Sequence, residues 1–439
     1  MFDHKGPFIF FIDMLGYALT GGKSTSGVAF LQMLFMFSDL LIIYITARMY
    51  EIKRIPSIFI SLTSLLAIKY NYIDGNTVEE WCLPFLLYSF YLILKYFKQE
   101  KSCNPSNGLV FGLTAAVCLF TRVTNLLPVI FGIIGIFINL LVQKRNKNIW
   151  KNILSFLVGF GILAVPFGIY FAANGCFYEF LNGTIFFNIK YAEKLDAWHI
   201  STDANGVRAF LKTYFLHYCI FLSVIFVWIK KNYSLMLILL CTGLSEVYIF
   251  WNGTGYGQYP LVCLPQFVLL LCEIYTSNTE PEKESKIFQQ ISFYLAFWFL
   301  GVCFYESAAG AKDYGNMYMH QSDRGWEGLM AEIPEEDKES FVAYGDNSFK
   351  EIYLLTDTMP CYKYFAIQEW HAMMSAEIKS DIHKTFADGN AKYILTVSST
   401  DNINDVLAER YHLVDSQNNM SLYQLNGCEE QPPSLHSSK

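Results

Sequence analysis

The sequence has little charge for its length. Of its 439 residues only 16% are charged, whereas 53% are hydrophobic and 17% are aromatic, a balance too apolar for an ordinary soluble globule. The apolar residues come in runs rather than in amphipathic stripes, and such runs predict membrane-spanning helices. The formal net charge is −7, with the excess acid after residue 310, which argues against a nucleic-acid partner.

Local metal-binding and targeting motifs are also missing. Most of the 11 cysteines lie inside apolar runs, where we expect them to pack as small hydrophobic residues. The sequence contains no Cys-x-x-Cys or His-x-x-x-His pair, so it predicts no zinc site and no other metal site. No basic segment precedes an apolar one at the N-terminus, so no signal peptide is predicted.

Ten apolar runs are candidate transmembrane helices. A shorter run, residues 8–16, precedes them and is predicted to lie at the membrane surface, because about 20 residues are needed to cross a bilayer. Residues 108–142 are divided into two helices with a turn at 121–125, since a single helix of that length would be about 50 Å long. The ten predicted spans are residues 27–47, 55–72, 81–97, 108–121, 126–142, 152–173, 209–229, 233–251, 259–276 and 288–307.

Basic residues are concentrated after alternate spans. Lysine and arginine follow the first, third, fifth, seventh and ninth spans, whereas the intervening loops are poor in basic residues and carry acidic ones. The positive-inside rule therefore places the basic loops in the cytoplasm. The acidic loops, the N-terminal stretch and everything after the tenth span are expected on the extracytoplasmic side of the cell membrane.

The chain changes character after residue 307, where apolar runs give way to short periodic segments and turns. The predicted fold class is a polytopic α-helical membrane protein, with about ten transmembrane helices plus an interfacial helix, and a small C-terminal extracytoplasmic α/β domain. The predicted parts are a transmembrane domain (1–307), a polar linker (308–337), the α/β domain (338–428) and a disordered tail (429–439). Within the α/β domain we expect strands at 340–344, 391–397 and near Leu413 and Leu422, and helices at 350–355, 376–386 and 403–411.

Four groups of polar residues share the predicted outer face. They are Asp3-His4-Lys5, residues 74–81, Arg122 with Asn125, and residues 251–260. Charged residues at membrane depth are costly and need a partner or a function. Each group also has a structural explanation, namely headgroup contacts for His4 and Lys5, the start of a helix for the acidic pair, an ion pair for the arginine, and an ordinary turn for residues 251–260.

Together the four groups predict the transfer of a sugar from a polyprenyl phosphate. This reaction needs a carboxylate to accept the proton of the acceptor hydroxyl, and cations to stabilise the departing phosphate. Lysine and arginine would contact the donor phosphate and the acidic residues would line the acceptor side, but no residue stands out as the base. The predicted substrate-binding residues are His4, Lys5, Asp74, Asn76, Glu79, Glu80, Arg122, Asn125, Tyr256, Gln258 and Tyr259.

The opening Asp3-His4-Lys5-Gly6-Pro7 resembles the end of the first outer loop in GT-C type membrane glycosyltransferases. The similarity is to the glycosyltransferase family 39-like branch with protein O-mannosyltransferases and aminoarabinose transferases of lipid A, where a Lys-Pro-Pro or His-Pro-Pro step occupies this position. Residues 74–81, Arg122 with Asn125, and residues 256–259 with Pro265 resemble segments of uncharacterised bacterial members. The resemblance implies inverting transfer from a polyprenyl-phosphate donor in the membrane lipid to a cell-envelope glycan or lipid acceptor, without a cofactor.

In that family the catalytic acid lies in the first outer loop, after a first transmembrane helix and before the proline step. The resemblance therefore places the acid upstream of Met1 and predicts a shortened enzyme. Two alternatives stay open. One is a non-catalytic scaffold or degenerate family member, which the missing acid favours. The other is a transporter of lipid-linked sugars, against which the uncharged spans 126–142 and 288–307 argue.

Overall fold

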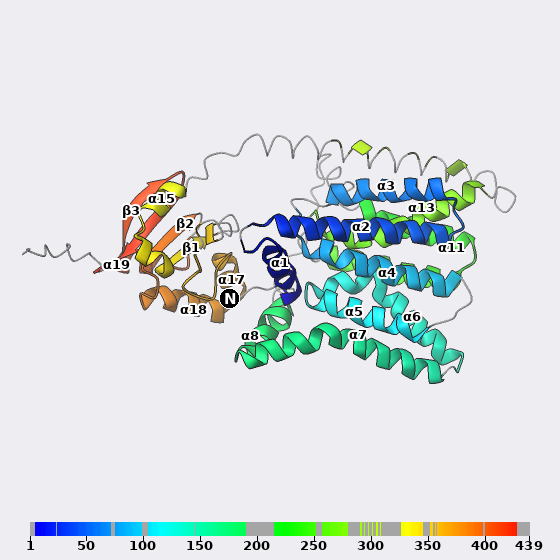
Figure 1. The fold of residues 1–439 in the computed structure, drawn as a ribbon, viewed down its shortest axis with the longest axis horizontal. Helices are drawn as coiled ribbons and strands as arrows, with labels where there is room; N and C mark the ends of the chain where they lie inside the picture. The colour runs from blue at the N-terminus through cyan, green and yellow to red at the C-terminus, as the bar shows by residue number, and fades with distance from the viewer. Residues whose placement is uncertain are drawn as a thin grey trace, which may run out of the picture. The chain divides into compact units, whose positions relative to one another are not determined.

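The computed structural model divides the chain into two compact units (Figure 1). The helical unit comprises Lys5–Phe180 and Leu195–Asn316, and the sheet unit comprises Met1–His4, Leu181–Lys194 and Met317–Lys439. The structure describes residues 5–22, 24–71, 75–98, 104–144, 146–189, 215–251, 257–279, 326–345, 352–353, 358–397 and 400–427, with residue 356 and scattered positions between 290 and 308.

The helical unit is a bundle of apolar helices. Among the described residues, four helical stretches are long and apolar enough to cross a membrane, namely Ser26–Met49, Val123–Val142, Ile149–Ala173 and Tyr259–Ser277, and five more apolar helices are shorter. The protein is thus a membrane protein. The helices are α1 (Pro7–Leu19), α2 (Ser26–Met49), α3 (Arg54–Asn71), α4 (Val78–Lys98), α5 (Pro105–Leu119), η1 (Val123–Leu126), α6 (Leu127–Val142), α7 (Asn146–Ala173), α8 (Phe177–Leu181), α11 (Phe215–Ile229), α12 (Tyr233–Trp251), η3 (Tyr259–Cys263) and α13 (Leu264–Thr279).

Two of the predicted boundaries have clear causes. Residues 108–142 form two helices as predicted, because α5 ends at Leu119 and α6 begins at Leu127. Asn104 caps the start of α5 by accepting a hydrogen bond from the Ser106 amide at 3.3 Å, and Pro128 lies in the first turn of α6, where a missing amide proton costs nothing. Residues 209–214 and most of the tenth predicted span lie outside the described residues, so the total of about ten stays a prediction.

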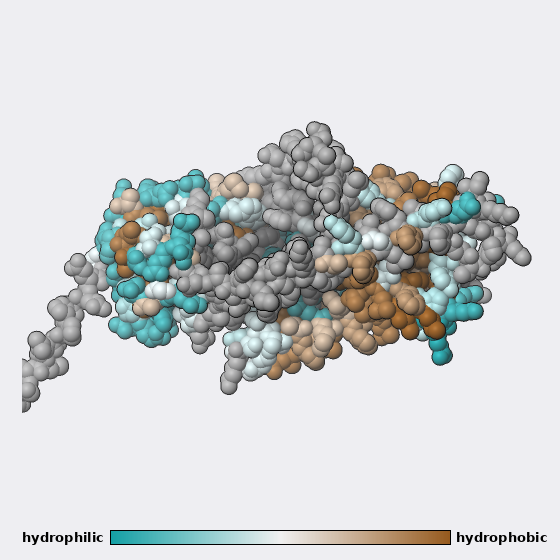
Figure 2. Space-filling model, turned by 90° about the horizontal axis from the view of Figure 1, so that it is seen from above, coloured by the Kyte–Doolittle hydropathy of each residue, from teal (hydrophilic) through white to brown (hydrophobic). Residues whose placement is uncertain are grey.

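Small residues bring α5 and α7 into backbone contact. A Cβ atom at Gly112 would lie 1.9 Å from the Phe156 carbonyl oxygen, and one at Gly159 would lie 2.0 Å from the Leu109 carbonyl oxygen. Such close approach is typical of helix pairs inside membranes, where side-chain packing replaces the hydrophobic effect. The opposite face of α7 exposes large apolar side chains such as Leu154. Figure 2 shows hydrophobic residues, in brown, over much of the visible surface of the helical unit.

The sheet unit contains a four-stranded mixed sheet in the order β1-β2-β4-β3. Strands β1 and β2 are parallel, whereas β2 with β4 and β3 with β4 are antiparallel. Separate clusters of buried apolar residues pack around it. Its elements are η2 (Asn182–Phe186), α15 (Glu327–Ala331), η5 (Glu335–Ser340), β1 (Phe341–Gly345), α17 (Gln368–Met374), α18 (Ala376–Ala387), β2 (Tyr393–Val397), α19 (Asn404–Arg410), β3 (Tyr411–Gln417) and β4 (Met420–Leu425).

The sheet unit extends beyond the boundaries drawn from the sequence. Its four strands, α18 and α19 occur where they were predicted, while the predicted helix at 350–355 falls largely outside the described residues. Trp326, Leu329 and Ile333 are buried in its core, although they belong to the range expected to be a linker. Phe187, from the connection between α7 and α11, is also buried in this unit, with its ring centroid 5.7 Å from that of Trp370.

Candidate active site

A backbone contact joins the N-terminus to the turn between α5 and α6. The Gly6 amide donates to the Thr121 carbonyl oxygen at 3.2 Å, and the Phe8 amide donates to the Phe120 carbonyl oxygen at 2.9 Å. A Cβ atom at Gly6 would lie 2.1 Å from that Phe120 oxygen, so a larger residue cannot occupy this position without displacing the backbone. The contact fixes the residue that precedes it, Lys5, next to the turn that carries the predicted arginine.

Arg122 is held by two groups from distant parts of the chain. Its Nη1 is 2.7 Å from Glu79 Oε1 at the start of α4, and its Nη2 donates to the Tyr259 hydroxyl of η3 at 2.8 Å. The guanidinium also lies over the tyrosine ring, with Cζ 3.9 Å from the centroid. The Glu79 side chain is 1% exposed and that of Arg122 is 29% exposed. Glu79 and Tyr259 therefore fix the orientation of the guanidinium, while part of the Arg122 side chain remains accessible.

Asn76 connects the start of α4 to α1. Its Nδ2 donates to Asp13 Oδ1 at 3.0 Å, and its Oδ1 accepts from the Trp81 indole nitrogen at 2.8 Å. Asn76 has a φ of 52°, a left-handed conformation that asparagine tolerates better than most residues. The bond from Trp81 thus fixes the orientation of the Asn76 amide, and the amide in turn holds the Asp13 carboxylate.

Asp13 is the site residue that the sequence reasoning missed. It was passed over because it lies within an apolar run, yet Ile9, Ile12 and Gly16 of the same helix are buried. The signal was its place beside this buried stripe, where an acid needs a partner.

We name the group formed by Lys5, Asp13, Asn76, Glu79, Arg122 and Tyr259 the polar cluster.

The environment of Asp13 suits a proton acceptor. Helix α1 has 13 residues, too few to span a bilayer, and its position at the membrane surface stays a prediction. Burial raises the pKa of the Asp13 carboxyl, while the hydrogen bond from Asn76 and the charge of Lys5 offset part of the rise. A carboxylate whose pKa is moved towards neutrality is a stronger base than an ordinary exposed one.

Several predicted site residues are not brought into this cluster. Glu80 is buried against α2, where it is 4% exposed and accepts from Gln32 Nε2 at 3.2 Å. Asn125 is 3% exposed and donates to Cys82 Sγ at 3.5 Å. Gln258 precedes η3, and its backbone carbonyl accepts from the Leu261 amide. The remaining predicted residues, His4, Asp74 and Tyr256, lie outside the described residues.

The sheet unit has a polar groove of its own, about 570 Å³ in volume. It is lined by α18 and by the segment that follows β2, and His383 Nε2 in it is 2.9 Å from Asp405 Oδ2. The hydrogen bond from His383 lowers the pKa of the Asp405 carboxyl. The groove is shallow and its ion pair is exposed, so we take the polar cluster and not this groove as the candidate active site.

Two comparisons with known proteins found a match. Residues 4–171, which contain all of the polar cluster except Tyr259, match the family model described as dolichyl-phosphate-mannose-protein mannosyltransferase. The fold is similar to the crystal structure of ArnT from Cupriavidus metallidurans bound to undecaprenyl phosphate, with a TM-score of 0.52, 12% sequence identity, and coverage of 96% of this chain and 88% of that chain. A search of curated proteins finds no match.

These comparisons show what the chain is similar to. At 12% identity the similarity to ArnT shows a shared fold, and the family model covers the N-terminal helices. The resemblance to GT-C type membrane glycosyltransferases, predicted from the sequence, is therefore confirmed.

Proposed function

We propose that the protein transfers a sugar from a polyprenyl-phosphate-linked donor to an extracytoplasmic acceptor of the cell envelope. The observation that carries the proposal is the half-buried Arg122, held by Glu79 and Tyr259 in the turn whose Thr121 carbonyl accepts from the Gly6 amide, the residue after Lys5. A guanidinium held in this way has the geometry and charge to bind a phosphate oxygen. The family match and the shared fold support the same reaction class.

In this proposal Lys5 and Arg122 bind the donor phosphate. Both are cations, and negative charge grows on the phosphate as the bond to the sugar breaks. Glu79 has a different role from the acceptor contact predicted from the sequence. Because it is 1% exposed and bound to Arg122, it positions the guanidinium instead of touching the acceptor.

Asp13 serves as the base on the acceptor side, with Asn76 as its positioning residue. The acceptor oxygen forms a bond to the anomeric carbon of the sugar, and the bond from that carbon to the phosphate oxygen breaks. The proton of the acceptor hydroxyl passes to Asp13, and polyprenyl phosphate leaves with the bonding electrons. Attack from the face opposite the phosphate inverts the anomeric configuration, as the resemblance implies.

The placement of the sheet unit outside the cytoplasm is part of the proposal. Residues Leu181–Lys194 belong to the sheet unit although they connect α7 to α11, so this connection and the C-terminal domain are expected on one side of the membrane. The connection follows a predicted span whose other end carries a basic loop, and the positive-inside rule places that loop in the cytoplasm.

Binding of undecaprenyl phosphate, a polyprenyl phosphate, tests the proposal without knowledge of the sugar, because the lipid phosphate is the part of the donor that Lys5 and Arg122 are proposed to bind. The wild-type protein in nanodiscs should bind undecaprenyl phosphate, and Arg122→Ala should bind it at least tenfold more weakly. Lys230→Ala is the matched control, since Lys230 pairs with Glu273 at 2.6 Å in the same unit but outside the polar cluster. A wild-type protein that does not bind the lipid, or an arginine variant that binds it normally, would contradict the proposal.

A further inference from the structure

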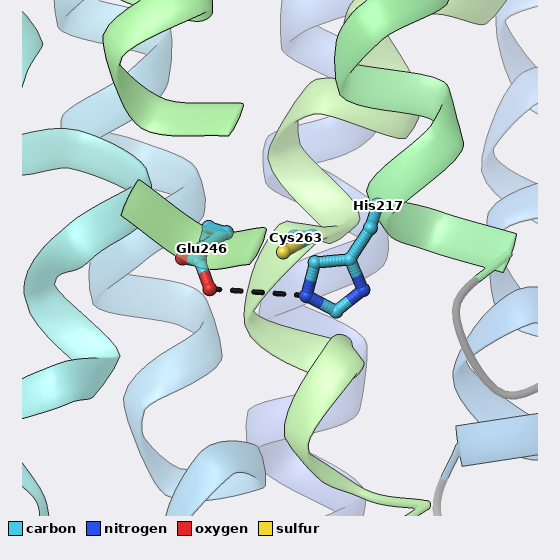
Figure 3. A group of neighbouring side chains, drawn as sticks. All are labelled: His217, Glu246 and Cys263. Atoms are coloured by element: carbon cyan, nitrogen blue, oxygen red, sulfur yellow. Dashed lines mark ion pairs between the residues drawn. The ribbon is translucent and has the colours of Figure 1, made fainter. Parts of the chain in front are cut away.

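Three metal-ligating side chains from different segments meet inside the helical unit. His217 of α11, Glu246 of α12 and Cys263 of η3 are each buried, and their ligand atoms all lie within 4.8 Å of one another. Figure 3 shows the imidazole and the carboxylate facing each other with the sulfur beside them. We name these residues the buried triad. The three residues are far apart in the sequence and therefore do not form a short metal-binding motif.

The geometry of the triad differs from that of a direct ion pair. His217 Nε2 is 3.8 Å from Glu246 Oε2, whereas the ion pair of Lys230 with Glu273 in the same unit has a distance of 2.6 Å. Two ligands of one tetrahedral zinc ion, each about 2.1 Å from the metal, are about 3.4 Å apart. The observed separation is therefore closer to that of two ligands sharing an ion than to that of a hydrogen bond.

The second carboxylate oxygen supports the same assignment. Glu246 is 1% exposed, and its Oε1 has no hydrogen-bond partner among the described residues. A buried charged oxygen without a donor is costly in a membrane protein, where water does not compensate. A cation in the triad would satisfy this oxygen as well as the one that faces His217.

The donor set selects the metal by charge and softness. A neutral imidazole, a carboxylate and a thiolate together carry two negative charges, which one divalent ion neutralises. Nitrogen, oxygen and sulfur donors in a tetrahedral arrangement suit Zn²⁺ better than Mg²⁺ or Ca²⁺, which prefer oxygen ligands. Binding releases the thiol proton of Cys263 to solvent, as thiolate coordination requires.

We propose that His217, Glu246 and Cys263 form a zinc site that fastens α11 and α12 to η3. Three protein ligands leave a fourth position for a water molecule. Cys263 lies four residues after Tyr259 in the same short helix, so the ion would hold the segment that presents the tyrosine hydroxyl to Arg122. The metal site stands on its own geometry and does not depend on the proposed transfer reaction.

Metal analysis of the full chain tests this proposal. The protein is purified with an affinity tag that lacks histidine, washed with a weak chelator that removes only loosely held ions, and analysed by mass spectrometry for bound metals. We expect about one zinc ion per wild-type chain, as for a site with dedicated protein ligands. The variants His217→Ala and Cys263→Ser should lose most of this metal. Cys272→Ser, which changes another fully buried cysteine in the adjoining helix, should keep it.

Cobalt substitution supplies a second readout that needs no variant. Protein produced with Co²⁺ in place of zinc should show intense visible bands of a tetrahedral ion and a thiolate-to-cobalt charge-transfer band. A wild-type protein that contains no zinc and shows no such spectrum would overturn the proposal, even if the variants fail to fold. Equal metal in Cys263→Ser and the wild type would overturn it too. Because both readouts measure metal and not transfer, they are independent of the test with undecaprenyl phosphate.

Discussion

The polar cluster and the buried triad are assembled in different ways. Most members of the polar cluster lie at helix ends and in turns, and its central contact joins Arg122 to Glu79 at 2.7 Å. The triad lies inside helices, with 3.8 Å between the imidazole and the carboxylate. The cluster therefore already contains a direct ion pair and hydrogen bonds, whereas the triad leaves room for an ion. This difference separates a site that binds an exposed anion from one that binds a buried cation.

The largest expected effect is that of Arg122→Ala on sugar transfer. Loss of the guanidinium removes a hydrogen-bond donor that would stabilise the departing phosphate. The rate of transfer should therefore fall by about 10² to 10³-fold. The rate is measured as release of polyprenyl phosphate from a labelled donor. A zinc content equal to that of the wild type would show that the two sites are separable.

One control is needed because this variant leaves Glu79 buried without its cation, which is itself destabilising. The double variant Arg122→Ala with Glu79→Gln removes both charges and should fold better, but it should remain equally inactive. Recovery of transfer in the double variant would show that Arg122 serves the fold and not the phosphate.

Asp13→Asn should lower the rate by about 10²-fold, the contribution of a well-placed general base. Only the deprotonated carboxylate accepts a proton, so wild-type activity should fall as the pH drops through the pKa of Asp13. Because burial raises that pKa, the acidic limb should lie above the usual range of an aspartate. The variant should have no such limb. An unchanged pH profile would exclude Asp13 as the base.

Glu246→Gln should act on stability more than on transfer. The amide keeps the size of the side chain but removes a charge from the triad, so the protein should hold zinc less tightly and unfold at a lower temperature. In the wild type a strong chelator should lower the melting temperature, and in this variant it should have little further effect. A chelator effect of the same size in both proteins would contradict the role of the triad.

The predictability of the two sites follows from where their residues lie. Arg122, Glu79 and Tyr259 were predicted as site residues because they belong to polar groups between apolar runs on the predicted outer face, so each stands out in the sequence. His217, Glu246 and Cys263 are single polar residues within or beside such runs, and only the packing of α11, α12 and η3 brings them together. A rule based on short metal-binding motifs therefore predicted no metal site.

The same reasoning explains the successes and failures in the fold. The turn at 121–125 that separates α5 from α6 was predicted, since Pro128 suits the first turn of a helix, but the Asn104-Pro105 cap that starts α5 three residues before the predicted span was not used. Helix α15 was assigned to a linker, although Trp326, Leu329 and Ile333 have helical spacing, because their neighbours are polar. The burial of Phe187 with Trp370 depends on long-range packing and has no local signal.

The smallest effect is expected for Asn76→Ala and concerns the pH profile. The hydrogen bond from Asn76 stabilises the charged form of Asp13 and lowers its pKa. Its removal should move the acidic limb of activity to higher pH by up to about one unit, because such a bond contributes about 0.5–1.5 kcal/mol. The limb is measured from initial rates between acidic and neutral pH.

Thr77→Ala is the neighbouring control for that shift. It alters the same segment, and its hydroxyl accepts from the Glu80 amide at 3.4 Å instead of contacting Asp13. If Asn76 only shapes the start of α4, both variants should lower the rate without moving the limb. A shift confined to Asn76→Ala would instead locate the titrating group at Asp13. Because no triad residue contacts Asn76 in the described structure, that shift should also appear in protein stripped of metal.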